Sequence, residues 1–133
     1  MSVIIHSVGI VFLNSNGEIL VLKRHPDQPE GGLWGLVGGE ITQDKKVFDV
    51  AKDKAKQETG LDLDTENLIF VNDYEWYRSE YNVIFDIYKY SLDSSPVIKI
   101  DPVGSTDFMW QTPLELLKRS DLVPDLYLIL KDL

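Results

Sequence analysis

The sequence predicts a mixed β-sheet with helices packed on it, which is an α/β or α+β sandwich. Segments rich in β-branched and aromatic residues, typical of strands, occur in the same chain as segments with the spacing of an amphipathic helix. Clusters of proline, glycine and asparagine separate them, as expected of turns and loops. Strands and helices that each have an apolar side must bury it against one another, so the pattern predicts layers of helix on sheet.

The first third of the chain is predicted to consist of strands. Residues 3–13 are rich in β-branched residues, and residues 18–24 form the return strand of a hairpin. The turn between them is Asn-Ser-Asn-Gly at residues 14–17, because Asn-Gly tolerates positive φ. Residues 25–32 contain two prolines and two glycines and predict a loop. Residues 33–41 predict a short strand that glycines interrupt.

The clearest helix is predicted for residues 44–59. Four residues recur at helical spacing and form one apolar to neutral face: Phe48, Ala51, Ala55 and Thr59. Gly60 follows directly and is expected to cap the helix at its C-terminal end.

The second half predicts further strands and two short helices. Residues 68–77 and 81–90 are aromatic-rich and predict a long hairpin around Arg78-Ser79-Glu80. Residues 108–111 predict a short strand. The following Thr-Pro-Leu-Glu at 112–115 combines a capping box with proline at the first helical position, and a last helix is expected from about 124 to 131. Trp76, Tyr77 and Tyr81 near the hairpin tip would stack a base or form a homodimer contact.

Composition limits the classes of function. With 133 residues the chain has the size of one domain, and it has no cysteine, which excludes disulfides, thiolate zinc sites and a cysteine nucleophile. No apolar run approaches the ~20 residues that span a bilayer, and the start lacks the features of a signal peptide, so no membrane association and a cytoplasmic location are expected. The net charge of -9 argues against long nucleic acid as a partner. A small phosphorylated ligand is compatible with it if a cation or a local basic pocket offsets the repulsion.

A glycine-rich segment carries the functional signal. Residues 31–40, Gly-Gly-Leu-Trp-Gly-Leu-Val-Gly-Gly-Glu, lead into the predicted helix, which ends in Gln-Glu-Thr-Gly-Leu at 57–61. A glycine pair between a strand and a helix lets the backbone come close to a ligand, and the free N–H groups of the helix start attract anions.

This segment resembles the Nudix box, G-x5-E-x7-R-E-U-x-E-E-x-G-U, where U is a bulky apolar residue. Gly39 and Gly60 fix the register, with the 20 residues that the box requires between them. Residues 19–24, 32–36, 107–110 and 113–117 are similar to neighbouring parts of the same family. The resemblance therefore covers nearly the whole chain. It implies one Nudix domain over residues 1–133, with an α/β/α sandwich and activity on nucleoside triphosphates or nucleoside-diphosphate-linked compounds.

The chain differs from the Nudix box at the positions whose side chains would bind the metal ion in the implied reaction. In the family, three helix glutamates hold Mg²⁺ or Mn²⁺; here these positions are Lys54, Gln57 and Glu58, which become the candidate catalytic residues. At 100° per residue the three share one helix face. Only Glu58 keeps a carboxylate, and magnesium prefers several hard oxygen ligands. Glu40 and Asp107 are further candidate metal ligands beside Glu58, and Asp44 and Asp101 are nearby acids of the same kind.

Two further departures are paired. The glutamate near the start of the box is Lys45 here, and the arginine is Asp53. The resemblance implies that these positions form an ion pair, which would persist here with its charges exchanged; the alternative is that both are solvated surface residues. The candidate residues for substrate binding are Arg24, Trp34, Gly38, Gly39 and Lys54, whereas His6 and His25 lack a partner motif and receive no catalytic role.

Three functions are consistent with these residues. The first is a Nudix hydrolase that is weak or divergent because box glutamates are replaced, with Mg²⁺ or Mn²⁺ as cofactor. The second is a non-catalytic protein that binds a small phosphorylated nucleotide, with Lys54 pairing directly with phosphate. The third is a protein-interaction domain with the same fold.

Overall fold

A computed structural model describes residues 3–77 and 80–133. Met1 and Ser2 lie outside the described residues, as do Arg78 and Ser79 of the predicted hairpin turn.

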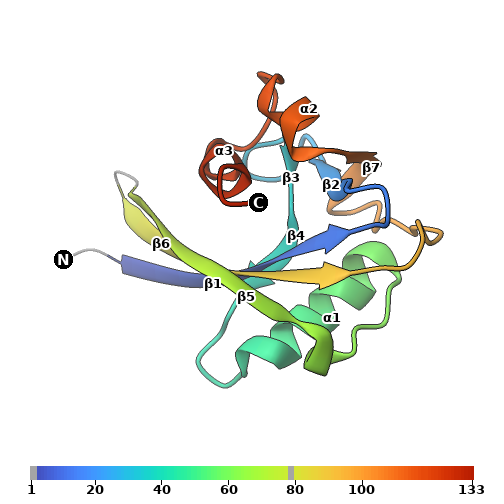
Figure 1. The fold of residues 1–133 in the computed structure, drawn as a ribbon. Coiled ribbons are helices and arrows are strands. Elements are labelled where there is room, and N and C mark those ends of the chain that lie inside the picture. Colours follow the sequence, from blue (N-terminus) through green and yellow to red (C-terminus); the bar gives the residue numbers. More distant parts are fainter. Residues whose placement is uncertain (1–2, 78–79) are drawn as a thin grey trace.

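The strands form one mixed sheet, which Figure 1 shows from its side. Along the described chain, seven strands follow the order β3-β2-β1-β6-β5, with β4 paired to β1 and β7 paired to β2. The β1–β6 pair is parallel and the other pairs are antiparallel. The sheet is therefore mixed, as predicted. The bounds are β1 Val3–Leu13, β2 Ile19–Arg24, β3 Trp34–Gly35, β4 Val37–Glu40, β5 Ile69–Tyr77, β6 Tyr81–Ser91 and β7 Ser105–Gln111.

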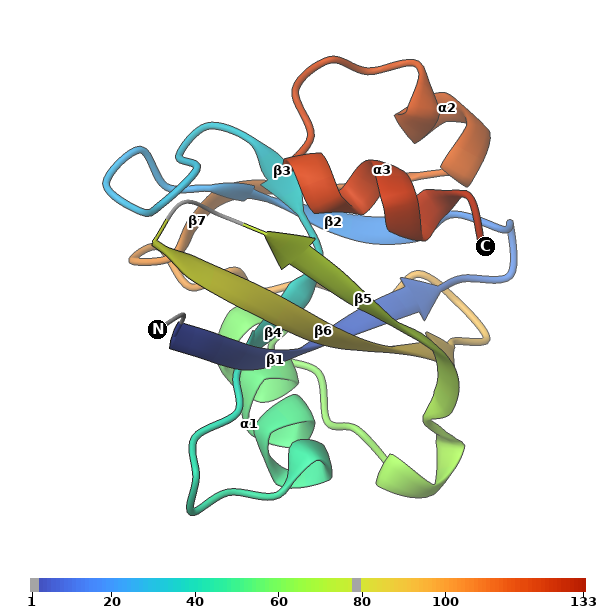
Figure 2. The same ribbon diagram turned by 90° about the vertical axis from the view of Figure 1, so that its left-hand side faces the viewer.

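Helices cover the sheet from both sides. Figures 1 and 2 show α1 (Val47–Thr59) on one side and α2 (Pro113–Leu117) and α3 (Pro124–Leu130) on the other. A 3-10 turn, η1 (Thr65–Asn67), follows α1. The arrangement confirms the predicted α+β sandwich.

Alternation along the strands divides the core into two layers. In β1, Val8 and Ile10 belong to the apolar cluster that contains Ala51 and Ala55 of α1. Val11 points to the opposite side and joins the cluster that contains Leu126 of α3. Since successive side chains of a strand point to opposite faces, a continuous apolar strand can supply both layers at once.

Helix α1 begins later than the sequence pattern predicts. It starts at Val47, not at residue 44, because Asp44 is engaged in a turn in which it accepts a hydrogen bond from the Thr42 hydroxyl (2.9 Å). Phe48 was expected on the buried face but is 41% exposed, and its ring packs edge-on against Tyr88 of β6. Ala51 and Ala55 are buried as expected.

The predicted C-terminal cap of α1 and the predicted capping box of α2 are confirmed. Gly60 adopts the left-handed conformation (φ 79°), and its N–H donates to the carbonyl of Lys56. At the start of α2, the Thr112 hydroxyl accepts from the Glu115 N–H while the Glu115 carboxylate accepts from the Thr112 N–H, which is a complete capping box. None of the helices in the described residues has the length and apolar character needed to cross a membrane.

Candidate functional site

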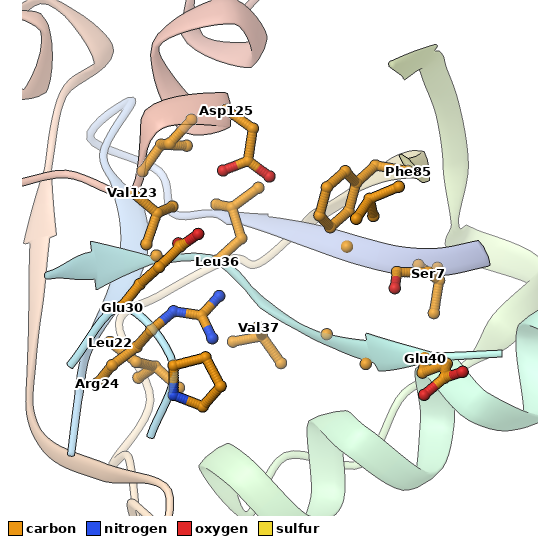
Figure 3. A pocket seen from close by; sticks show the side chains of 18 of the residues that line it. Ser7, Leu22, Arg24, Glu30, Leu36, Val37, Glu40, Phe85, Val123 and Asp125 are labelled. Carbon is orange, nitrogen blue, oxygen red and sulfur yellow. The ribbon is translucent and has the colours of Figure 1, made fainter. Parts of the chain in front are cut away.

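A pocket of about 310 Å³ opens between the sheet, α1 and α3. In Figure 3, Arg24 and Val37 lie toward α1, while Leu36, Phe85 and Asp125 lie toward α3. The part of the pocket near Arg24 and Val37, which also contains Gly38, Gly39 and Glu58, is here called the glycine end. The part near Leu36, Phe85 and Asp125 is called the α3 end. The volume is at the lower limit of typical small-molecule sites, enough for one compact ligand.

The glycine pair forms the floor of the glycine end through very close backbone contacts. Gly38 pairs with Gly9 of β1, and a Cβ at Gly38 would lie 2.1 Å from the Val8 carbonyl oxygen. The Gly38 N–H donates a hydrogen bond to Oε1 of Glu58 (3.0 Å). A Cβ at Gly39 would instead meet the side chain of Lys54, at 2.6 Å from Cε. Because both residues are glycine, the backbone of β4 lies in close contact with β1 and with helix α1.

Glu58 is the box carboxylate that the chain retains, and it lies at this floor. Burial raises its pKa above 4.5, while the Gly38 N–H and the nearby Lys54 and Arg24 charges act in the opposite direction. Asp101 adds a smaller effect that raises the pKa further. The net rise means that the folded protein favours the protonated form of Glu58 more than the unfolded chain does.

Replacing Glu58 by glutamine is therefore expected to change how stability depends on pH. A raised folded-state pKa gives a stabilising contribution that is fully present below about 4.5 and is lost as pH rises through the folded value. Glu58→Gln does not titrate, so its melting temperature should rise relative to the parent as pH increases from about 4 to about 8. Thermal unfolding across that range measures the difference.

Glu66→Gln is the matched control, because Glu66 is an exposed glutamate in η1, away from the pocket. The control should show no comparable pH trend. A Glu58→Gln advantage that shrinks as pH rises would contradict the assignment of a desolvated carboxyl to Glu58.

Lys54 and Gln57 lie at the rim of the pocket and are not among the described residues that line it. The Lys54 Nζ contacts the Gln57 Oε1 at 3.4 Å, and the Gln57 Nε2 contacts Asp101 Oδ2 at 3.4 Å. The three box positions do share one side of α1 beside the pocket. Their chemistry is an ammonium, an amide and one carboxylate.

This set of donors does not fit a divalent cation. Within residues 3–77 and 80–133, no three Asp, Glu or His side chains come together in a group that would hold a metal ion. Glu40 and Glu58 both line the pocket, but Asp107 does not. Asp107 lies in β7 opposite Lys23, and its carboxylate accepts from the Phe108 N–H (2.7 Å). The predicted trio of Glu58, Glu40 and Asp107 is thus separated by the pairing of β7 with β2.

Arg24 provides the positive charge of the glycine end. A register shift between Lys23 and Arg24 interrupts the pairing of β2 with β7, and such bulges redirect side chains. The Arg24 side chain lines the pocket and passes Gly35, where a Cβ would lie 3.4 Å from Nε. Its Nε is buried, and no group of the described residues accepts a hydrogen bond from it. A buried donor without an acceptor is costly, and the guanidinium of the same side chain is the cationic group that lines this part of the pocket.

Trp34 does not line the pocket, contrary to the expectation. It is 6% exposed and packs in the core layer of α2 and α3, with the Arg119 guanidinium 5.8 Å from the centre of its ring. Its backbone bonds to Asp121 and Val123 hold it to the segment before α3. The buried Trp34 ring therefore contributes to the packing of the segment before α3 against the sheet.

The exchanged ion pair does not form. Lys45 and Asp53 are both exposed, and neither takes part in an ion pair with the described residues. Lys45 precedes the helix in a turn in which its N–H donates to Thr42. His6, which was given no catalytic role, contacts Asp86 at 2.7 Å outside the pocket.

Residues of the C-terminal part that were not predicted as site residues also line the pocket. Asp125 of α3 is 7% exposed and lines the α3 end together with Leu126 and Ile129. The signal was present, since Asp125 is the acidic residue in the otherwise apolar stretch 122–130. Tyr81, which was expected to stack a base or contact a second copy, lines the pocket, whereas Tyr77 is 70% exposed.

Comparison with known proteins identifies the family. A family model for the NUDIX domain matches residues 4–133. The chain belongs to the Nudix family. Nudix hydrolase 8 from Arabidopsis thaliana is 32% identical over 84 residues, which are 61% of this chain and 21% of that protein. The chain thus spans about a fifth of the length of this curated relative.

Solved Nudix structures share the fold across the chain. The MutT protein from Methanosarcina mazei Go1 has a TM-score of 0.87 at 19% identity, with coverage of 98% of this chain and 92% of that one. The Nudix domain of Shewanella oneidensis NrtR, solved with ADP-ribose, has a TM-score of 0.79 at 17% identity, covering 99% and 86%. At these identities the likeness establishes the fold alone.

Proposed function

We propose that this Nudix domain binds a small phosphorylated nucleotide in the pocket and that its hydrolytic activity is weak or lost. The proposal rests on one combination of features: a cationic side chain, Arg24, lines the pocket, while the set of metal ligands in the box is incomplete. The Arg24 side chain lines the pocket, and no group of the described residues accepts a hydrogen bond from its buried Nε, whereas the box positions supply one carboxylate, one amide and one ammonium.

Charge explains how a nucleotide would be held without a resident cation. The chain has a net charge of -9, so a phosphate group needs a local positive site. The Arg24 guanidinium presents a planar set of donors that matches phosphate oxygens. The Lys54 ammonium at the rim adds a second cation beside Gly39. Together they would replace part of the charge that a metal ion supplies.

Binding should therefore depend on Arg24 and not on a divalent cation. Titration calorimetry with ADP-ribose, the ligand of the NrtR domain, would be run in a chelator. Arg24→Gln is expected to weaken binding by roughly tenfold or more, as for loss of a charge-assisted hydrogen bond.

Lys23→Gln is the matched control, because Lys23 lies next to Arg24 in β2 but does not line the pocket. It should leave the affinity nearly unchanged. Equal losses in both variants would indicate a general charge effect, and binding that requires Mg²⁺ or Mn²⁺ would contradict the proposal.

A second candidate is slow hydrolysis supported by Mn²⁺ or Mg²⁺. It is favoured by Glu58, which keeps its bond to the Gly38 N–H, and by Asp101, whose charge acts on Glu58. Phosphate release from a panel of nucleoside triphosphates, dinucleotides, ADP-ribose and nucleotide sugars tests it. Turnover that disappears in Glu58→Gln would support this candidate in place of binding alone. A homodimer and a cytoplasmic location stay predictions of the sequence.

A further inference from the structure

Two nearly buried serine side chains line the pocket. Ser7 of β1 is 8% exposed and Ser105 of β7 is 9% exposed. Among the described residues, no group forms a hydrogen bond with either hydroxyl. Neither oxygen is a fully enclosed atom without a partner, so each keeps contact with the cavity. Because buried hydroxyl groups usually have a hydrogen-bond partner, both are suited to bind a ligand in the pocket.

Ser105 lies beside Arg24. The two residues are opposite each other in the antiparallel pairing of β7 with β2, and opposite side chains of such a pair share one face of the sheet. Arg24 is the cationic residue among the described residues that line the pocket. A guanidinium and a hydroxyl both donate hydrogen bonds, and the oxygens of one phosphate group accept several at once. This side of the pocket is therefore suited to a phosphate group.

Ser7 has different neighbours. It pairs with Phe85 of β6 on one side and with Glu40 of β4 on the other, and all three residues line the pocket. Figure 3 shows Ser7 between these two side chains, with Arg24 at the opposite side of the pocket. The Glu40 carboxylate would repel a phosphate, whereas a ring can pack on Phe85 and an uncharged polar group can bond to the Ser7 hydroxyl. This side is therefore suited to a nucleoside.

We infer that the pocket binds its nucleotide in one direction, with a phosphate group beside Arg24 and the nucleoside at the opposite side. The Ser105 hydroxyl contacts the phosphate, and the Ser7 hydroxyl contacts the nucleoside. The reverse direction would place the phosphate beside Glu40 and away from the guanidinium. The inference rests on the proposed function, because it takes the pocket as the nucleotide site. It goes further by adding two binding residues and by assigning each of them to one part of the ligand.

Two ligands distinguish the two sides of the pocket. ADP-ribose carries a diphosphate between an adenosine and a ribose, whereas inorganic pyrophosphate is the diphosphate alone. ADP-ribose binding would be measured by titration calorimetry in a chelator, and pyrophosphate binding by competition with ADP-ribose. Ser105→Ala is expected to weaken the binding of both ligands by roughly threefold to tenfold, as for the loss of one hydrogen bond. Ser7→Ala should weaken ADP-ribose binding by a similar factor and leave pyrophosphate binding unchanged.

Ser91→Ala is the matched control. Ser91 is an exposed serine at the end of β6, outside the pocket, so this variant should keep the affinity of the parent for both ligands. Serine and alanine differ by one oxygen atom, so the three substitutions change the packing little. Far-ultraviolet circular dichroism checks that the variants are folded.

The outcomes separate this inference from the proposed function. Absence of ADP-ribose binding to the unmodified protein would overturn the proposed function, and the inference with it. Pyrophosphate binding that is weakened by Ser7→Ala and not by Ser105→Ala would show the reverse direction and overturn the inference alone. ADP-ribose affinity that is unchanged in both variants would also overturn the inference and leave the proposed function intact, because neither hydroxyl would then contact the ligand.

Discussion

Replacing Lys54 and Gln57 together by glutamate is expected to increase divalent-cation binding strongly over that of the parent chain. Both side chains lie at the rim beside Glu58 and contact each other at 3.4 Å, so the change places three carboxylates on one side of α1. Asp101 is already in contact with position 57. Mg²⁺ and Mn²⁺ favour such clusters of hard oxygen ligands, and removing the Lys54 ammonium removes a direct repulsion.

We expect a large increase in metal binding by the double variant, and two measurements test it. Titration with Mn²⁺ should show much tighter binding in the double variant than in the parent. If the rest of the pocket still fits the family's substrates, phosphate release in Mn²⁺ or Mg²⁺ should also rise, by about tenfold or more. The calorimetric signal tests the ligand set even where turnover stays low.

A control with the same change in charge separates ligand geometry from general acidity. Lys52→Glu with Gln43→Glu alters two exposed residues, and Lys52 lies on the other side of α1 from position 54. It should bind no more Mn²⁺ than the parent. Failure of Lys54→Glu with Gln57→Glu to bind the ion would show that the arrangement around Glu58 no longer suits a metal, whatever the side chains.

Of the substitutions described here, Gly38→Ala is expected to lower the free energy of unfolding the most. The added methyl would lie 2.1 Å from the Val8 carbonyl oxygen and 3.0 Å from the Gly9 Cα, and both of these are backbone atoms of β1. Neither can move without breaking the β1–β4 pairing. The free energy of unfolding should fall by about 3 kcal/mol or more, measured by urea unfolding.

Gly39→Ala is the natural comparison, because the same methyl is added one residue later. There it would meet the stem of Lys54, a flexible side chain that can swing toward solvent. The expected cost is below about 1 kcal/mol. Equal losses at the two positions would contradict the close backbone approach at Gly38 as the reason for the glycine pair.

Features that depend on neighbouring residues could be predicted from the sequence. The Asn-Gly turn, the left-handed Gly60 cap and the Thr112 capping box all use hydrogen bonds between residues a few positions apart. Their signals lie within short segments, so these turns and caps and the class of fold could be predicted, although α1 starts at Val47 and not at residue 44. The spacing of the box likewise predicted that Glu58 and the glycine pair lie together, as the Gly38 bond shows.

Contacts between segments far apart in the chain determine which of the other candidate residues reach the pocket. The pairing of β7 with β2 takes Asp107 away from Glu58, and packing under α3 takes Trp34 into the core. Folding also brings Asp125 to the same cavity as Arg24, which is about a hundred residues earlier in the chain. Such contacts depend on how the strands pair and how the layers stack, and both are determined by the burial of apolar residues over the whole chain. No local pattern of charge or spacing encodes them.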